Sequence, residues 1–186
     1  MGGYESLLVY RLAVTIDEGT FLFCQKFLSD WLEKRTVEQM IQASRSGKQN
    51  IVEGSLEKSC EGNIKLTGVA RASYGELLED FKDFLRRRKL RLWEKNDPKT
   101  LKIRAFREVV GKETNLTNLS NWANLNLDNS EDFANLMICL IYKESFLLDQ
   151  LIRSQEKKFV EEGGFREGLF RKRREYLGKN KLDKLV

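Results

Sequence analysis

The chain has 186 residues, of which 41% are apolar, and its formal net charge is +5. This length suits one compact domain and is too short for two domains of ordinary size. A single proline, Pro98, and an abundance of Leu, Glu, Lys, Arg and Gln favour helix over sheet, so we expect an all-α protein.

The composition also lowers the expectation of catalysis. The chain contains no histidine, the commonest general base and metal ligand. Its three cysteines, Cys24, Cys60 and Cys139, include no CxxC pair, so the sequence predicts neither a disulfide framework nor a zinc site. No window approaches the roughly 18 apolar residues of a membrane span. We expect a cytoplasmic protein that is not an enzyme and uses no cofactor, metal or membrane.

Apolar residues spaced three, four and seven apart predict amphipathic helices over residues 4–34, 37–57, 63–92, 98–110 (a short one) and 130–161. Thr36 and Gln39 form a capping box for the second helix, and Gly62-Asn63 marks the turn before the third. Pro98 suits the first turn of the short helix, and Asn129 or Ser130 caps the last one. The run "NLTNLSNWANLNLDNS" is predicted to be an irregular connector, with one turn of helix around Trp122.

These elements predict an antiparallel up-down four-helix bundle over residues 1–164, followed by a basic C-terminal extension over residues 165–186. In the second helix, Gly47 and Gly54 fall on the apolar stripe. We expect them to let that helix approach the small residues of the third helix closely. Gly47-Lys48 does not end a phosphate-binding P-loop, because the glycine five residues earlier and the Ser or Thr that must follow are both missing.

The positive charge is concentrated at the C-terminal end. Residues 165–186 hold eight Lys or Arg and three Asp or Glu, whereas residues 1–164 are neutral overall. The extension contains four consecutive cations, Arg171, Lys172, Arg173 and Arg174. Such an asymmetry predicts a polyanionic partner, the alternative being an ordinary solvated terminus.

A second basic block lies near the end of the third predicted helix. It comprises Arg86, Arg87, Arg88, Lys89 and Arg91. Cations at a helix C-terminus also interact favourably with the helix dipole, so the block is equally well explained as a solvated helix end.

Three segments carry a family resemblance: "RTVEQMIQASRSGKQNIVEGS", "VARASYGELLEDFKDFLRRRKLRLW" and "ANLMICLIYKESFLLDQLIRSQEKKFVEEGGF". Over roughly residues 4–170, the chain resembles a bacterial four-helix-bundle family. That family includes the protein encoded in the intervening sequence of ribosomal RNA genes and the four-helix-bundle suffix-domain proteins. The accessory variability protein of diversity-generating retroelements is a relative.

The resemblance implies a bundle that assembles as a ring, commonly a homopentamer, with a positively charged surface. It also implies an accessory protein that binds DNA or RNA and assists a reverse transcriptase or an RNA element. Here the predicted bundle is charge-neutral, so the expected phosphate-binding residues are Arg45 and Lys48 together with the two basic groups above. They would act by neutralising phosphates rather than by reading bases.

A second hypothesis belongs to another class of protein. The chain would be a protein-protein interaction scaffold with no nucleic-acid role, and Trp93 and Trp122 would be its exposed aromatic contacts. The two hypotheses differ in what residues 165–186 do, because only the first needs their charge.

Overall fold

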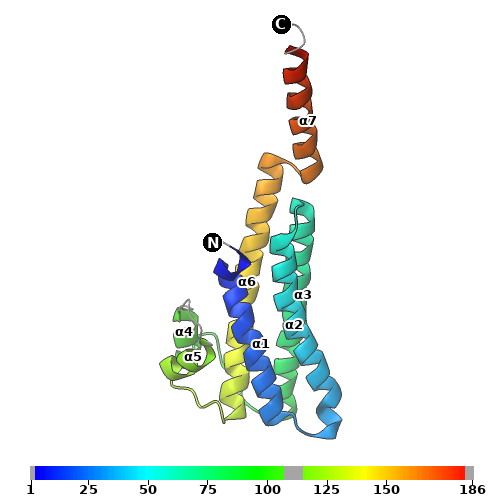
Figure 1. Cartoon of the computed structure of the whole chain (residues 1–186). Coiled ribbons are helices and arrows are strands. Elements are labelled where there is room, and N and C mark those ends of the chain that lie inside the picture. The colour runs from blue at the N-terminus through cyan, green and yellow to red at the C-terminus, as the bar shows by residue number, and fades with distance from the viewer. Residues whose placement is uncertain (1–2, 107–114, 183–186) are drawn as a thin grey trace.

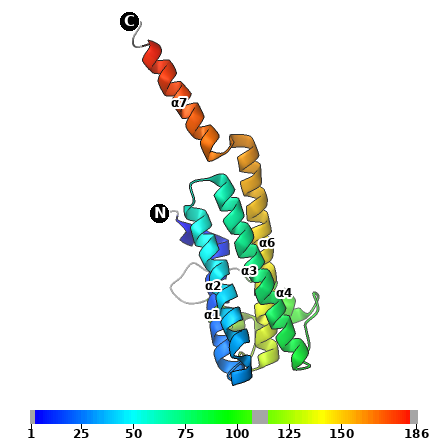
Figure 2. The ribbon, with the colours of Figure 1, turned by 90° about the vertical axis from the view of Figure 1, so that its right-hand side faces the viewer.

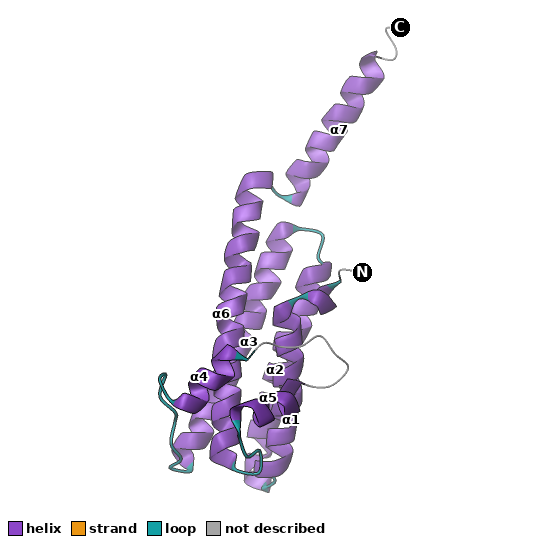
Figure 3. Cartoon of the chain, turned by 90° about the vertical axis from the view of Figure 1, so that its left-hand side faces the viewer, coloured by secondary structure: helices purple, strands orange, loops and turns teal. Residues whose placement is uncertain are grey.

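The structure is a computed structural model of the chain, and it describes residues 3–106 and 115–182. Within these two stretches every regular element is a helix, which confirms the all-α prediction (Figure 3). The elements are η1 (Tyr4–Ser6), α1 (Leu8–Phe27), η2 (Trp31–Glu33), α2 (Lys34–Leu56), α3 (Cys60–Arg87), α4 (Pro98–Ala105), α5 (Asn115–Ala123), α6 (Ser130–Glu162) and α7 (Phe165–Leu182).

Four long helices lie side by side and form the bulk of the molecule (Figure 1). α1 packs against α2 and α6, and α3 packs against the same two helices from the other side. We call α1, α2, α3 and α6, together with the turn η2 between α1 and α2, the helical body. The short helices α4 and α5 pack on each other beside α6 and α1, whereas α7 extends beyond the end of the body (Figures 1 and 2).

The core contains a cluster of aromatic rings at the level where α1, α3 and α6 meet. Phe23 is fully buried, and its ring centroid lies 4.9 Å from that of Phe81, 4.7 Å from that of Phe84 and 5.5 Å from that of Phe133. Edge-to-face contacts at these distances are favourable beyond the area they bury. The cluster therefore fixes the three helices against one another.

The first two predicted helices are correct in place but wrong at their boundary. α1 ends at Phe27 rather than at residue 34, because Asp30 accepts a hydrogen bond from the backbone of Leu32 and starts the separate turn η2. That turn runs directly into α2, so Thr36 lies inside the helix and does not cap it. Residues 35 and 36, predicted to separate the first two helices, therefore belong to α2.

The third helix begins and ends earlier than its pattern predicts. Ser59 caps α3 by accepting a hydrogen bond from the backbone of Gly62 at 2.9 Å, so Gly62 and Asn63 belong to the first helical turn. At the other end Lys89 has a φ of 55°, and the backbone N–H of Leu90 donates to the carbonyl of Leu85 at 2.9 Å. This is the Schellman termination that glycine usually provides, here formed by a lysine.

The C-terminal half differs from the prediction in two places. Residues 115–123 form helix α5 instead of an irregular connector. The predicted extension is also helical, as α7. The Asn129 cap of α6 is confirmed. Asp97 caps α4, and residues 107–110 of the predicted short helix lie outside the described residues.

The close approach predicted at Gly47 occurs, but its partner is different. A Cβ atom on Gly47 would lie 2.6 Å from Cζ of Tyr74, whose ring is fully buried. The glycine therefore makes room for a large aromatic side chain of α3, not for small residues. Gly54 approaches Leu66 and Asn63 of the same helix, where an added Cβ would have contacts of 3.3 Å.

Candidate nucleic-acid interface

The basic block at the end of α3 is engaged with carboxylates. Arg86 lies 2.7 Å from Asp83, and Arg87 lies 3.5 Å from the other oxygen of the same carboxylate. Arg88 pairs with Glu33 at 2.9 Å, across the gap between α3 and η2. These pairs leave little net positive charge for a polyanion on this part of the body.

Further acidic groups strengthen that conclusion. Burial, together with the charges of Asp83 and Glu76, raises the pKa of Asp80 on the same helix. The charge of Arg87 opposes that shift, so Asp80 is a further carboxyl group close to the basic block. Lys89 is exposed and follows the three paired arginines directly in the chain.

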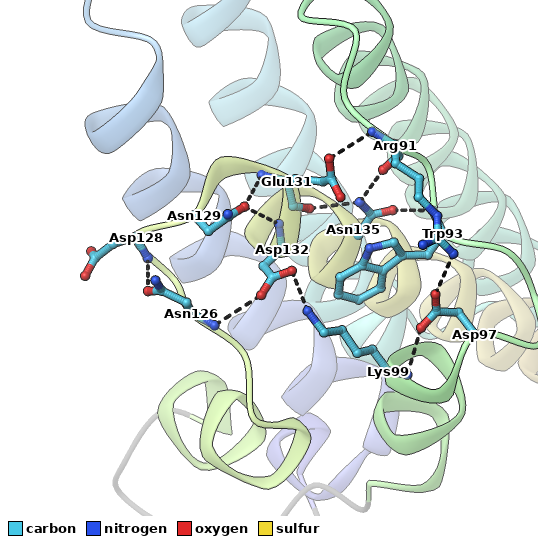
Figure 4. Close-up of polar contacts among 10 residues, drawn as sticks. All are labelled: Arg91, Trp93, Asp97, Lys99, Asn126, Asp128, Asn129, Glu131, Asp132 and Asn135. Carbon is cyan, nitrogen blue, oxygen red and sulfur yellow. Dashed lines mark hydrogen bonds and ion pairs between the residues drawn. The ribbon is translucent and has the colours of Figure 1, made fainter.

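Arg91 belongs to a structural network, although its side chain is 64% exposed (Figure 4). Its guanidinium lies 2.9 Å from a carboxylate oxygen of Asp97, and its backbone N–H donates to Glu131. The side chain of Asn135, only 1% exposed, donates to the backbone carbonyls of Arg91 and Glu131 and accepts from the N–H of Trp93, each at 2.8 Å. The network holds the segment after α3 against α6.

The same network fixes α4 on α6. Lys99 Nζ lies 2.7 Å from Asp132 and 5.0 Å from the centre of the Trp93 ring. Trp93 is half-buried beneath that ammonium group, so it is not the exposed aromatic contact that the scaffold hypothesis required. The side chain of Trp122 lies outside the described part of the structure.

Lys48 is also unavailable as a phosphate ligand. Its ammonium group forms an ion pair with Asp17 of α1, and Ser44 donates a hydrogen bond to the other oxygen of that carboxylate at 3.0 Å. Arg45, one turn away from Gln49 on α2, is exposed. It lines an open hollow of about 490 Å³ between α1 and α2 whose other lining residues are Asp17, Glu18, Phe21, Leu22, Ile41, Lys48 and Gln49.

Polar groups continue inward from the Lys48 ion pair. Burial and the charges of Glu144 and Asp17 raise the pKa of Tyr74 well above its ordinary value, so its hydroxyl stays protonated. Burial and the neighbouring charge of Asp17 raise the pKa of Glu18, and the charge of Lys48 opposes that shift. These polar residues come from four different helices: Asp17 and Glu18 from α1, Lys48 from α2, Tyr74 from α3 and Glu144 from α6. They share no sequence motif, so their proximity could not be predicted from the sequence.

The ion pair between Asp17 and Lys48 contributes to stability, and replacing Asp17 with alanine measures that contribution. The two side chains are only 23% and 27% exposed, so the lysine left behind would be incompletely hydrated. We expect Asp17→Ala to lower the free energy of unfolding in urea by about 1–3 kcal/mol.

The matched control is Asp128→Ala. Asp128 pairs with Lys26 at 2.5 Å, but its side chain is 83% exposed. An exposed pair contributes at most about 1 kcal/mol. Equal losses in the two variants would contradict a structural role for the Asp17 pair.

The cysteines have the character of core residues. Burial raises the pKa of Cys24 to about 12 and that of Cys139 to about 11, so both thiols stay protonated and unreactive near neutral pH. Among the residues that the structure describes, no group of three or more His, Cys, Asp or Glu side chains could hold a metal ion. In the same residues no helix is both long and apolar enough to cross a membrane.

The cations of α7 are placed differently from those of the body. All four side chains of the run at 171–174 are exposed, on a helix that forms no interface with a body helix in the described structure (Figure 2). Arg171 donates a hydrogen bond to the backbone carbonyl of Glu162, and Lys172, Arg173 and Arg174 are exposed. We call these four residues the basic run.

Two glycines make the elbow from which α7 leaves the body. Gly163 has a φ of 79°, a conformation that side-chain-bearing residues rarely adopt, and it ends α6. Glu167 then accepts a hydrogen bond from the backbone of Gly164 at 3.0 Å, which caps the first turn of α7. The basic run is thus held on a regular helix and away from the carboxylates of the body.

Apolar side chains on α7 were missed in the sequence analysis. The exposed ones are Phe165, Leu169, Phe170, Tyr176 and Leu177. Their spacings of four and seven residues are those of a helix face, and that signal is present in the sequence. The many charged residues of this segment favoured its prediction as a basic extension, and the helical spacing of its apolar residues was not used.

No family model, curated protein or solved structure matches the chain. The functional assignment therefore depends on the residues described above. All of the predicted phosphate ligands except Lys48 are exposed. The structure pairs Lys48, Arg86, Arg87, Arg88 and Arg91 with carboxylates, and it leaves Arg45, Lys89 and the basic run without a carboxylate partner among the described residues.

Proposed function

We propose that the chain is a non-catalytic nucleic-acid-binding accessory protein whose contact with DNA or RNA is made by α7. One observation carries the proposal: the basic run is exposed on a projecting helix, whereas most candidate cations of the body are paired with carboxylates. The proposal therefore moves the interface from the surface of the body to α7.

Binding would depend on charge rather than on base sequence. Lysine and arginine side chains that approach phosphates release condensed counterions, and this release supplies sequence-independent affinity. The acidic residues of α7 are Glu167 and Glu175, which Arg166 and the basic run outnumber, so the helix keeps a net positive charge. Such an interface positions a nucleic acid without reading its bases.

The helical body would serve as an assembly platform. We propose that α1, α2, α3 and α6 form an antiparallel up-down bundle and that several copies associate, a homopentameric ring being the form that the family resemblance implies. Large exposed apolar residues on the body support an assembly surface: Phe21 is 56% exposed, Trp31 is 80% exposed and Phe146 is 60% exposed. Several α7 helices in one assembly would multiply weak phosphate contacts, and the ligand could be an RNA element or the template of a reverse transcriptase.

Salt dependence tests the proposal. For the full chain and a labelled oligonucleotide, we expect the logarithm of the association constant to fall steeply and linearly with the logarithm of salt between about 50 and 200 mM. Replacing all four residues of the basic run with alanine removes up to four phosphate contacts, which should reduce the slope by about 3 and the affinity by at least about tenfold. Fluorescence anisotropy measures both quantities.

The control variant replaces Arg86, Arg87 and Arg88 with alanine. Because these residues are paired with Asp83 and Glu33, we expect this variant to keep the salt slope of the parent. A slope that changes in the control and not in the basic-run variant would place binding on the body. Affinity that does not respond to salt in the parent would refute the proposal.

A protein-interaction scaffold is the second candidate, and the exposed apolar residues of the body favour it. Trp31 and Leu32, at 80% and 68% exposed, would be partner contacts in place of the half-buried Trp93. A chain lacking residues 165–186 should keep its protein partners if this function is correct. It should lose nucleic acid if the first is correct.

A further inference from the structure

α7 carries exposed aromatic rings next to its cations. Phe170 and Tyr176, at 62% and 66% exposed, lie on either side of the basic run in the sequence. Phe165 is 44% exposed at the start of the same helix. Exposed rings of this size are costly to leave in water and indicate a surface that a ligand covers.

The cations and apolar residues of α7 are interleaved around the helix. With 3.6 residues per turn, Phe165, Leu169 and Tyr176 form one stripe, and Phe170 forms a second stripe with Leu177. Arg166 and Arg173, seven residues apart, lie between the two stripes. The helix thus has no continuous apolar face.

This interleaving decides between two anionic ligands. A helix that lies on an anionic bilayer needs one continuous apolar face with cations at its edges, and here two guanidinium groups would be buried among acyl chains. A single-stranded nucleic acid presents phosphates and unstacked bases in alternation, which matches alternating cations and rings. A duplex offers its phosphates but no free base face for an aromatic ring, since its bases are already stacked on one another.

We infer that α7 binds single-stranded nucleic acid, with Phe170 and Tyr176 as stacking platforms for bases and the basic run as the phosphate contact. This inference rests on the proposed function and adds the class of ligand. Stacking tolerates any base, so the interface would prefer single strands over duplexes without a strong sequence preference. Single-stranded RNA and single-stranded DNA share the chemistry involved.

The experiment compares four ligands for the full chain. They are single-stranded RNA, single-stranded DNA and duplex DNA, each of about 16 nucleotides per strand, and vesicles of phosphatidylserine and phosphatidylcholine. We expect both single strands to bind at least about tenfold more tightly than the duplex. A 2-aminopurine base in the single strand should lose fluorescence on binding, as a stacked base does.

The variant that tests the platforms is Phe170→Ala combined with Tyr176→Ala. Both side chains are exposed and alanine favours helix, so we expect α7 to persist in this variant, as circular dichroism will check. Affinity for single strands should fall by at least about tenfold, with an unchanged salt slope and an unchanged duplex affinity. Tyr142→Ala, which removes an aromatic of α6 that is 52% exposed, is the matched control and should behave as the parent.

The inference and the proposed function fail in different ways. If duplex and single strands bind equally, or the double variant keeps the affinity of the parent for single strands, the inference is overturned and phosphate binding by α7 stands. If no nucleic acid binds at low salt, or only the vesicles bind, both are overturned. If single-stranded RNA and single-stranded DNA bind with different affinities, and the double variant still loses affinity for both, the inference is supported. The tighter ligand then identifies which nucleic acid the interface prefers.

Discussion

Gly47→Leu is expected to prevent the chain from folding. A Cβ atom alone would lie 2.6 Å from the ring of Tyr74, and that ring is fully buried and cannot swing aside. Leucine adds three further carbon atoms in the same direction.

For the milder variant Gly47→Ala we expect a loss of about 1–3 kcal/mol in the free energy of unfolding, in spite of the higher helix propensity of alanine. Circular dichroism and urea unfolding measure these effects.

Gly75→Ala is the control for backbone entropy. Gly75 lies inside α3, one residue after Tyr74, and an added Cβ would meet no atom within 4 Å. Alanine should therefore stabilise the chain by about 0.5–1 kcal/mol. If Gly47→Ala is as stable as Gly75→Ala, the close contact between α2 and α3 is wrong. If Gly47→Ala causes a smaller loss of stability in a Tyr74→Leu background than in the parent, the ring is confirmed as the obstacle.

Asn135→Ala is expected to remove about 2–4 kcal/mol of stability, because it breaks three hydrogen bonds at once. The amide group satisfies the carbonyls of Arg91 and Glu131 and the N–H of Trp93, each at 2.8 Å. The carbonyl of Arg91 and the N–H of Trp93 belong to the segment between α3 and α4, so these two groups take no part in the backbone hydrogen bonds of a helix. Urea unfolding gives the loss, and hydrogen exchange at the Trp93 amide should speed up by a larger factor than in the core of α6.

Asn126→Ala is the matched substitution for this effect. The side chain of Asn126 is exposed and accepts one hydrogen bond, from the backbone of Asp128 at 2.9 Å. We expect a change below about 1 kcal/mol. Equal losses at Asn126 and Asn135 would mean that Asn135 does not hold the segment in place.

The long helices could be predicted from the sequence because their apolar residues recur with the helical period. Their ends could not always be predicted. α3 ends at a left-handed Lys89, where the expected signal is glycine, and α2 starts from the turn η2 instead of from its capping box at Thr36. Such endings depend on which tertiary contacts the chain makes next, and a local pattern does not contain that information.

Ion pairs within one helix of the candidate site could be predicted from the sequence, whereas ion pairs between helices could not. The pairs of Arg86 and Arg87 with Asp83 are visible in the sequence as spacings of three and four residues on a helix. The pair of Lys48 with Asp17 joins two helices, so it required the fold. The sequence therefore identified the cations but not which of them the protein itself neutralises, and that difference moved the proposed interface to α7.

A small change of angle at the Gly163 elbow corresponds to a large displacement of the far end of α7. A helix of 18 residues reaches about 27 Å from its hinge. At that length a turn of about 20° at the elbow carries the far end through about 9 Å, roughly the distance that separates two neighbouring packed helices. Gly163, the described residue of the elbow with a positive φ, adopts a backbone conformation that residues with side chains rarely adopt, so this glycine helps to set the direction in which the arm points.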